Sequence, residues 1–409
     1  MRTPGIAVAL SALVAGACLG GTELVTPPYQ PPTTITLVFR PDSEDAATAS
    51  ALGWTRGIPN VQVTLTSLDS TNSAPQLIQG SDSGTLVLDQ LSAGRYLVEA
   101  ARWLSDSERA QLPAGDDALG FVARVRLITA SATAEMPIRL PANRRKSLVI
   151  SEWAFNAHAY QYGGFLELYN NSDTTVYLDG MLIARGFDVA FDYPNFPCAL
   201  YTSVTNDPTS IWARVIQKFP GTGRDYPVAP GQTIVIATDA IDHRPVDSSA
   251  IDLRSANFEF TAPVDVDNPA VPNMIDVGII NLNHGLRWDL VVAVVVVALP
   301  ADVATLPRGR PGSESATDWI RIPRDLMLDV LWIRSNYAGA PYPECPRLVH
   351  KNFDRDGAAM RGTDEIAEVN FSVSRRSLPH LLDGRKVLQE TRSGNADFIR
   401  TVRNPGVVP

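Results

Sequence analysis

Glu152 and Glu167 are two carboxylates in this chain that could act as the paired acids of a glycoside hydrolase. Such enzymes need two carboxyl groups that face each other across a cleft, one as the proton donor and the other as the base or nucleophile. Both residues lie in short apolar segments that we predict to be strands, at 148–153 and 164–169. We therefore expect a structural, hydrogen-bonding role for both and predict no catalytic residue.

Other catalytic and cofactor patterns are incomplete. Gly80 and Gly84 are spaced like the glycines of a nucleophile elbow, but Asp82 stands where a serine is needed. The histidines are scattered and form no His-Glu-x-x-His zinc helix, and no glycine-rich phosphate loop occurs. The histidines are His158, His243, His284, His350 and His380. The sequence therefore predicts that the protein is not an enzyme and needs no cofactor.

Two acidic stretches resemble fragments of calcium loops. Asp354 and Asp356 are two positions apart and are followed by Gly357, which allows a sharp turn. The stretch lacks a third acidic position and the closing glutamate, and the stretch at Asp265 and Asp267 is weaker still. We therefore predict no metal site and keep Asp354 and Asp356 as weak calcium candidates, the alternative being a plain Asp-Gly turn.

Cys18 closes a basic, apolar N-terminal segment that is much shorter than the ~20 residues needed to span a bilayer. This pattern is typical of an export signal. Residues 13–18 resemble the lipobox of bacterial lipoproteins, with Ala15 where that family prefers a larger aliphatic residue. The resemblance implies cleavage after Ala17, acylation of Cys18 and anchoring to a membrane. The alternative is an ordinary secretory signal with a chance cysteine.

Cys198 and Cys345 are the remaining cysteines, and both lie in proline-rich loops. If the protein is exported, its compartment is oxidising, so the two thiols are a candidate disulfide. Closing so long a loop would contribute roughly 3–5 kcal/mol. The alternative is two unpaired thiols.

Length and charge limit the classes of protein. A chain of 409 residues predicts two or three domains. The formal net charge of -9 argues against nucleic acid as a partner, since phosphate binding needs basic patches. The expected order is a signal peptide at 1–17, a proline-rich tether at 18–32, a first folded unit at 33–141 and a second at 147–409, joined by a solvated basic hinge at 143–147.

The first unit contains alternating, β-branched segments that predict strands, with a capped short helix at 105–112. The predicted strands lie at 34–39, 61–65, 86–88, 96–100 and 134–140. The order of glycine, strand, Asp-Ser-Gly turn, strand and the turn before Tyr96 resembles the carboxypeptidase regulatory-like, transthyretin-like sandwich family. That resemblance implies a rigid accessory module without catalytic residues.

The second unit begins with strand and turn signals, and 290–299 is predicted to be a strand buried on both faces. The motifs Ile-Ser-Glu at 150–152, Phe-x-Glu-Leu-Tyr-Asn at 165–170 and Tyr-Leu-Asp-Gly at 177–180 resemble the lamin-tail domain, an immunoglobulin-like sandwich. The end, 369–398, resembles a lamin-tail-like family of bacterial surface lipoproteins known as a domain of unknown function. Segments 187–212 and 250–346 are expected to be long loop insertions.

Aromatic residues gather in the loops and insertions of the second unit, often beside proline, asparagine or glycine. Rigid rings on sandwich loops can stack on sugars or anchor a protein partner. The candidate ligand contacts are Tyr160, Tyr162, Tyr193, Trp212, Tyr226, Tyr337 and Tyr342. The alternative is that these rings fold back and cover the sandwich.

We therefore expect an all-β protein with two antiparallel β-sandwich domains, transthyretin-like and immunoglobulin-like, in tandem after a lipoprotein signal peptide. It would be exported and lipid-anchored to the outer membrane or cell surface of a bacterium, as a non-enzymatic binding or assembly module. Its partner would be an outer-membrane protein, by analogy an uptake receptor, or an extracellular glycan. The alternatives are an extracellular hydrolase acting on glycan and a purely structural envelope component.

Overall fold

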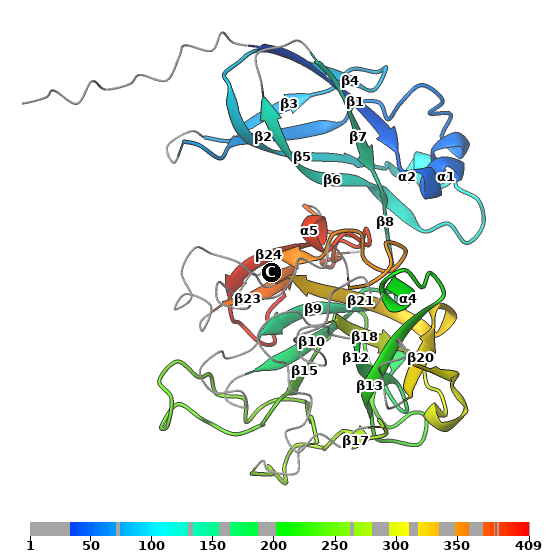
Figure 1. Cartoon of the computed structure of the whole chain (residues 1–409), viewed down its shortest axis with the longest axis vertical. Coiled ribbons are helices and arrows are strands. Elements are labelled where there is room, and N and C mark those ends of the chain that lie inside the picture. The colour runs from blue at the N-terminus through cyan, green and yellow to red at the C-terminus, as the bar shows by residue number, and fades with distance from the viewer. Residues whose placement is uncertain are drawn as a thin grey trace, which may run out of the picture.

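The chain is all-β, as the sequence predicts (Figure 1). The structure is a computed structural model. It describes residues 33–70, 74–129, 134–154, 164–186, 202–261, 266–279, 294–310, 318–334, 348–359, 371–379, 381–382 and 384–408. Among these residues, no helix has both the length and the apolar character that a membrane crossing requires.

Two sheets pack together in the first half of the chain. The three-stranded sheet has the order β4 (Thr85–Leu91), β1 (Thr33–Pro41) and β7 (Ala134–Leu140), in which β1 and β7 run parallel. The five-stranded sheet has the order β3 (Gln76–Gln79), β2 (Gln62–Ser67), β5 (Gly94–Trp103), β6 (Ala118–Thr129) and β8 (Ala142–Arg144). Alternate side chains of both sheets meet in one apolar core that includes Leu37, Val63 and Phe121.

The first half also contains short helical turns. A 3-10 turn, η1 (Ser43–Asp45), leads into α1 (Ala46–Ala51), and α2 (Asp106–Arg109) follows β5. Ser105 and Glu108 form a capping box at the start of α2, which confirms the capped helix predicted there.

Two larger sheets form the second half. The six-stranded sheet has the order β16 (Phe258–Glu259), β15 (Thr233–Ala237), β10 (Phe165–Asn170), β9 (Leu148–Ala154), β23 (Phe371–Arg375) and β24 (Phe398–Val402). The eight-stranded sheet has the order β19 (Arg308–Gly309), β20 (Trp319–Pro323), β13 (Ser210–Lys218), β12 (Leu182–Gly186), β18 (Val294–Ala298), β21 (Met327–Arg334) and β22 (Ala358–Ala359), with β17 (Ile275–Asp276) pairing β13.

Smaller elements complete the second half. They are the two-stranded sheet of β11 (Val176–Tyr177) and β14 (Pro227–Val228), the helices α4 (Thr202–Thr205) and α5 (Gly394–Asp397), and the 3-10 turns η3 (Val303–Thr305) and η4 (Arg324–Leu326).

The eight-stranded sheet is buried on both faces, which explains the apolar run at β18. Val295 and Val297 point into the core shared with the six-stranded sheet, whereas Val294 and Val296 point into a second core. A strand buried on both faces is therefore confirmed for 294–298, the described part of 290–299. The expectation that 250–346 is a loop insertion is wrong, because this segment supplies β18, β20 and β21 to the sheet.

The two halves are joined by a polar and apolar interface. Arg376 pairs with Glu99 at 3.0 Å, Arg392 pairs with Glu44 at 2.9 Å, and Arg355 pairs with Asp42. Beside these ion pairs, Leu119 of β6 packs in one apolar cluster with Leu378, Val387 and Leu382 of the second half. Helix α5 lies against β6 in the same region (Figure 1).

The basic hinge at 143–147 is part of this interface and not the solvated linker expected from its charge. Asn143 is fully buried, and its side-chain oxygen accepts the backbone N–H of Glu390 at 2.6 Å. Arg144 pairs with Asp45 at 2.6 Å, and Lys146 pairs with Glu390 at 2.8 Å. The hinge is basic because buried carboxylates on both sides of it need partners.

Candidate ligand-binding site

Most of the residues singled out from the sequence lie outside the described residues. They are Cys18, Cys198, Cys345, Tyr160, Tyr162, Tyr193, Tyr337 and Tyr342, together with His158, His284, His380, Asp265 and residues 1–32. The acylation site, the candidate disulfide and five of the aromatic candidates therefore stay predictions.

Trp212 does not offer an exposed ring. It lies in β13, is 7% exposed and belongs to the second apolar core of the eight-stranded sheet. Its ring nitrogen donates to Asp207 at 3.1 Å, and the Arg321 guanidinium lies 5.2 Å from its ring centroid. The interpretation of Trp212 as a ligand contact is therefore corrected, since this ring covers the sheet.

Asp354 uses its carboxylate to bind backbone, not calcium. It is 2% exposed, and its oxygens accept the N–H groups of Gly357, Gly394 and Trp332 at 2.9, 3.0 and 3.1 Å. Burial raises its pKa to about 6, although these N–H groups oppose the shift. Asp356 accepts hydrogen bonds from Ser393.

The weak calcium interpretation is therefore replaced by a carboxylate that ties three segments together. Gly357 has φ +68°, the left-handed value of a tight turn, so the Asp-Gly turn alternative fits this stretch. Among the described residues, no group of three histidine, cysteine or carboxylate side chains could hold a metal ion.

Glu152 and Glu167 are direct cross-strand neighbours on β9 and β10, and both are almost completely buried. Glu152 accepts the backbone N–H of Asn404 at 3.1 Å, and Glu167 accepts the N–H of Gly406 and the hydroxyl of Ser151. Burial raises the pKa of both carboxyls, that of Glu167 to about 7. The pair holds the C-terminal segment against the six-stranded sheet.

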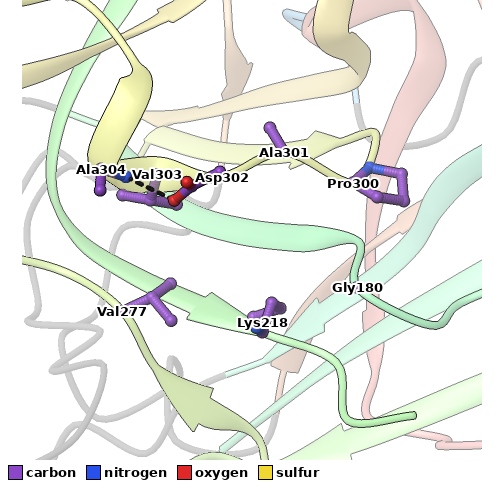
Figure 2. Close-up of a pocket in the computed structure, with 8 residues that line it drawn as sticks. All are labelled: Gly180, Lys218, Val277, Pro300, Ala301, Asp302, Val303 and Ala304. Carbon is purple, nitrogen blue, oxygen red and sulfur yellow. Dashed lines mark hydrogen bonds between the residues drawn. The ribbon is translucent and has the colours of Figure 1, made fainter. Parts of the chain in front are cut away.

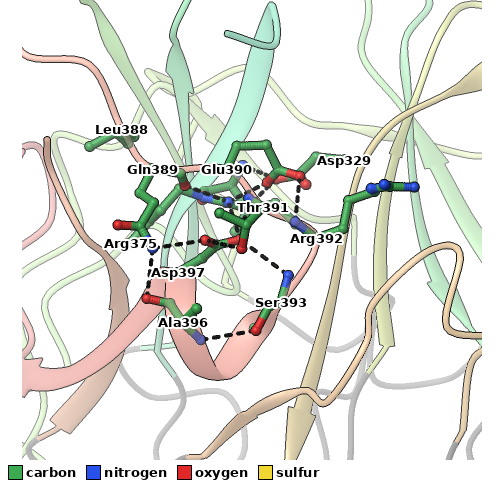
Figure 3. Close-up of polar contacts among 12 residues, drawn as sticks. Asp329, Arg375, Leu388, Gln389, Glu390, Thr391, Arg392, Ser393, Ala396 and Asp397 are labelled. Atoms are coloured by element: carbon green, nitrogen blue, oxygen red, sulfur yellow. Dashed lines mark hydrogen bonds and ion pairs between the residues drawn. The ribbon is translucent and has the colours of Figure 1, made fainter. Parts of the chain in front are cut away.

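Arg375 is the centre of the largest buried ion network among the described residues (Figure 3). Its guanidinium is 1% exposed and pairs with Asp329 at 2.6 Å, with Glu390, and with Asp397 at 3.7 Å. It also donates to the carbonyl of Ile150 at 2.6 Å.

The pKa values of two carboxyl groups in this network shift in opposite directions. Burial and the neighbouring Glu390 raise the pKa of Asp397 to about 7. Burial would raise the pKa of Glu390 too, but Lys146 and Arg375 outweigh it and lower that pKa to about 2. Glu390 is hydrogen-bonded through its backbone to the hinge, so the network anchors the interface between the two halves.

An open depression of about 700 Å³ lies beside β13 and the segment before η3 (Figure 2). Eight of the described residues line it: Gly180, Lys218, Val277, Pro300, Ala301, Asp302, Val303 and Ala304. Asp302 caps η3 by accepting the N–H of Ala304 at 3.0 Å. Among the described residues of the lining, Lys218 and Asp302 are the charged side chains and no aromatic ring occurs, so these residues offer few groups that could orient a ligand.

Tyr226 lines a second open depression, of about 260 Å³. Its ring is half-buried and packs edge-on against Phe258 at a centroid distance of 5.0 Å. The exposed side chains of Asp225, Gln232 and Asn257 line the same depression. One oxygen of each already accepts a backbone N–H, from Thr222, Ala229 and Val235 respectively, which fixes these side chains and leaves their other polar atoms for a ligand. Of the two aromatic candidates that lie among the described residues, Tyr226 is the one placed at such a depression, with amide and carboxylate groups beside it that can hydrogen-bond a polar ligand.

Asp179 fixes the loop that carries Tyr226. Its carboxylate accepts the backbone N–H groups of Gly223, Asp225 and Tyr226 at 2.9, 2.8 and 3.0 Å. Burial alone would raise the pKa of Asp179, but these three N–H groups outweigh it and lower the pKa. The site is therefore held ready before any ligand arrives, which reduces the entropic cost of binding.

Sequence reasoning identified Tyr226 but missed the polar side chains around it. Gln232 lies in the Ala-Pro-Gly-Gln stretch before β15, and Asn257 lies just before β16, which joins β15 in parallel. Gln232 and Asn257 come together because β15 and β16 pair in parallel, and no local sequence pattern predicts such a pairing.

The fold and the site together define an all-β protein with two pairs of packed sheets and a surface depression suited to binding. Residues 229–404 match the family model described as a protein of unknown function, DUF4876. The match begins just before β15, so it takes in only part of each large sheet and leaves out β9 to β14 of the second half. The chain therefore contains a domain of unknown function of this family.

One of three solved structures that resemble the chain shares its fold. A crystal structure of a DUF4876 family protein from Bacteroides thetaiotaomicron has 18% sequence identity and a TM-score of 0.52, with 92% of this chain and 98% of that chain covered. A DUF3823 family protein from Parabacteroides merdae has 9% identity and a TM-score of 0.18, covering 72% and 96%. A putative carbohydrate binding protein from Bacteroides uniformis has 8% identity and a TM-score of 0.18, covering 75% and 100%.

The first of these likenesses shows the fold, and the other two are too remote to bear on fold or function. No curated protein matches the chain.

Proposed function

We propose that this chain is a membrane-anchored, cell-surface lipoprotein of bacteria that serves as a non-enzymatic binding or assembly module. The observation that carries the proposal is the Tyr226 depression, where a half-buried ring on the loop held by Asp179 lies beside the exposed polar side chains of Asp225, Gln232 and Asn257. A ring with hydrogen-bonding groups beside it suits a sugar or a polar protein segment.

The anchor gives this binding its mechanism. Acylation of Cys18 would confine the protein to a membrane surface, and the proline-rich residues 18–32 would hold the folded units away from it. Confinement raises the effective concentration of any partner on the same surface, so a weak contact at one depression suffices. The transthyretin-like unit would lie nearest the membrane, and the lamin-tail-like unit would present the Tyr226 depression.

Cross-linking in cells tests the partner. A tagged chain is cross-linked on the cell surface, and the proteins that co-purify are identified, with Cys18→Ala as the unanchored control. We expect one outer-membrane protein that is lost in the control. Recovery of the chain alone, unchanged by Cys18→Ala, would contradict this proposal and favour a structural envelope component.

Substitution of the ring tests the site. Tyr226→Ala should weaken capture of the partner, or of a glycan on an array, by about tenfold. Tyr96→Ala is the matched control, because Tyr96 is also half-buried against a core but lies in the other half of the chain. Equal capture by both variants would exclude the Tyr226 depression as the binding site.

A further inference from the structure

Three arginines line an open depression of about 480 Å³ in the first half of the chain. Arg40 stands near the end of β1, Arg139 near the end of β7, and Arg56 in the segment after α1. These elements meet at one end of the first pair of sheets (Figure 1). The depression therefore concentrates positive charge on a chain whose formal net charge is -9.

Two of these arginines are direct neighbours. Arg40 and Arg139 are in register on the parallel strands β1 and β7, so their side chains leave the same face of the sheet. Like charges opposite each other on adjacent strands repel and destabilise the pair. Both side chains are exposed, and within the described part of the chain neither has a carboxylate partner that would cancel the repulsion.

The carboxylate of this depression is already in use. Asp42 pairs with Arg355 of the second half and accepts the backbone N–H of Glu44 at 3.1 Å. Asp42 is thus occupied by Arg355 and by the cap of η1, and among the described residues no ion pair joins it to Arg40, Arg56 or Arg139. The charge at Arg40, Arg56 and Arg139 remains available to a ligand.

Trp54 adds an aromatic surface to the same depression. Its ring is half-buried, and one part of it packs against Phe121 at 5.4 Å and under the Arg102 guanidinium at 5.3 Å. Because these contacts fix the ring, the part that lines the depression is a rigid platform. The hydroxyls of Ser50 and Thr55 also line it.

We propose that this depression binds an anionic saccharide, a sugar unit that carries a carboxylate or a sulfate. The planar guanidinium fork matches both groups by paired hydrogen bonds, while the tryptophan provides a surface for the sugar ring. The volume is within the range of small-ligand pockets, and a concave site fits one or two sugar units better than a flat membrane surface. The first unit then contains a second binding site and also serves as a spacer.

Calorimetric titration of the purified full chain tests this proposal. The probes are trigalacturonate and a sulfated disaccharide from chondroitin, with a neutral galactose trisaccharide for comparison. We expect the chain to bind one or both anionic probes and not the neutral one, with affinity that falls as salt rises. The double variant Arg40→Gln with Arg139→Gln should raise the Kd by about tenfold or more.

Three further measurements make the result specific. Arg308→Gln is the control, because Arg308 is also exposed and without an ion pair among the described residues, but lies in the second half. Trp54→Phe should weaken binding while the melting temperature, followed in parallel, stays near that of the parent. Vesicles with and without anionic phospholipid test the other source of negative charge.

The proposal is overturned if neither anionic probe binds, if the neutral probe binds equally, or if the double variant binds like Arg308→Gln. Binding to anionic vesicles alone would overturn it in favour of a lipid surface. None of these outcomes depends on Tyr226, so the proposed function and this inference can fail separately.

Discussion

Glu167 is a buried carboxyl whose titration should be visible in the stability of the protein. Its pKa in the folded chain is raised to about 7, from 4.5, mainly by burial. An acid with a raised pKa binds its proton more tightly in the folded state, so its protonation stabilises the fold at low pH. That stabilisation is lost as the pH rises from 4.5 to about 7, and it amounts to roughly 3 kcal/mol.

Glu167→Gln removes this titration and keeps a neutral side chain that can hydrogen-bond Ser151 and Gly406. We expect the free energy of unfolding of the variant, relative to the parent, to increase between pH 5 and pH 8. Urea unfolding at several pH values measures it, with Glu135→Gln at an exposed position as the control. A constant difference across this pH range would show that Glu167 is not the titrating group.

Arg375 should be among the most sensitive residues in the chain. Arg375→Met would leave Asp329, Glu390 and Asp397 without their shared cation in a fully buried site. Removing one partner of a buried ion pair typically costs about 3–5 kcal/mol. Chemical denaturation should show a loss of this size, whereas Arg308→Met at the surface should cost under about 1 kcal/mol. Similar losses for both would mean that the network contributes little.

The site residues illustrate what sequence can say about single side chains. The type of Tyr226 and its place beside a proline predicted a ring near the surface, and the structure places it there, half-buried. Trp212 has the same aromatic character and was wrongly assigned, because its exposure depends on the sheet that packs over it. The roles of Asp354 and Arg375 depend on partners tens to hundreds of residues away, which no local pattern records.

At the scale of elements, the strands with strict alternation or continuous burial were predictable. The predicted segment at 134–140 coincides with β7, and 96–100 lies within β5. The twelve-residue β6 was missed, because its polar and apolar residues do not alternate strictly along its length. The pairing of strands was not predictable, since β9 joins β23 across more than two hundred residues.

The Asp179 loop is the element that should control the Tyr226 depression. Gly221 has φ +111°, and a Cβ there would lie 2.8 Å from Cγ of Asp179. Gly221→Ala should therefore displace the carboxylate and release the N–H groups of Gly223, Asp225 and Tyr226. Hydrogen exchange at these amides should accelerate by about tenfold or more. Gly223→Ala is the control, since Gly223 also has positive φ but open space at its Cβ.

If both glycine variants accelerate exchange equally, backbone strain alone explains the effect and Asp179 does not hold the loop. If neither does, the three hydrogen bonds are not what orders it. Acceleration in Gly221→Ala alone would link the carboxylate to the geometry of the site.

At the scale of the whole molecule, composition and length predicted more than one folded unit, but not that the units form a shared interface. The hinge at 143–147 looks solvated in sequence because it is basic, yet Asn143 is fully buried and Arg144 and Lys146 have carboxylate partners. The partners come from Asp45 in one half and Glu390 in the other, so their proximity is a property of the assembled fold.

The apolar part of this interface should make the two halves unfold together. Leu119 and Leu378 are 7% and 6% exposed and belong to the same small apolar cluster. Neither residue belongs to the main core of its own half. Truncating a buried leucine to alanine costs about 2–5 kcal/mol. For Leu119→Ala with Leu378→Ala, that loss falls on the coupling between the halves and spares both cores.

Scanning calorimetry of the parent should therefore show one cooperative transition, and the double variant should show two. Leu77→Ala, at a 73% exposed position, is the control and should leave the single transition in place. A single transition that merely shifts to lower temperature in the double variant would show that the ion pairs at Asp42, Glu44 and Glu99 couple the halves without the leucines. Two transitions in the parent itself would mean that the halves fold independently despite their contacts.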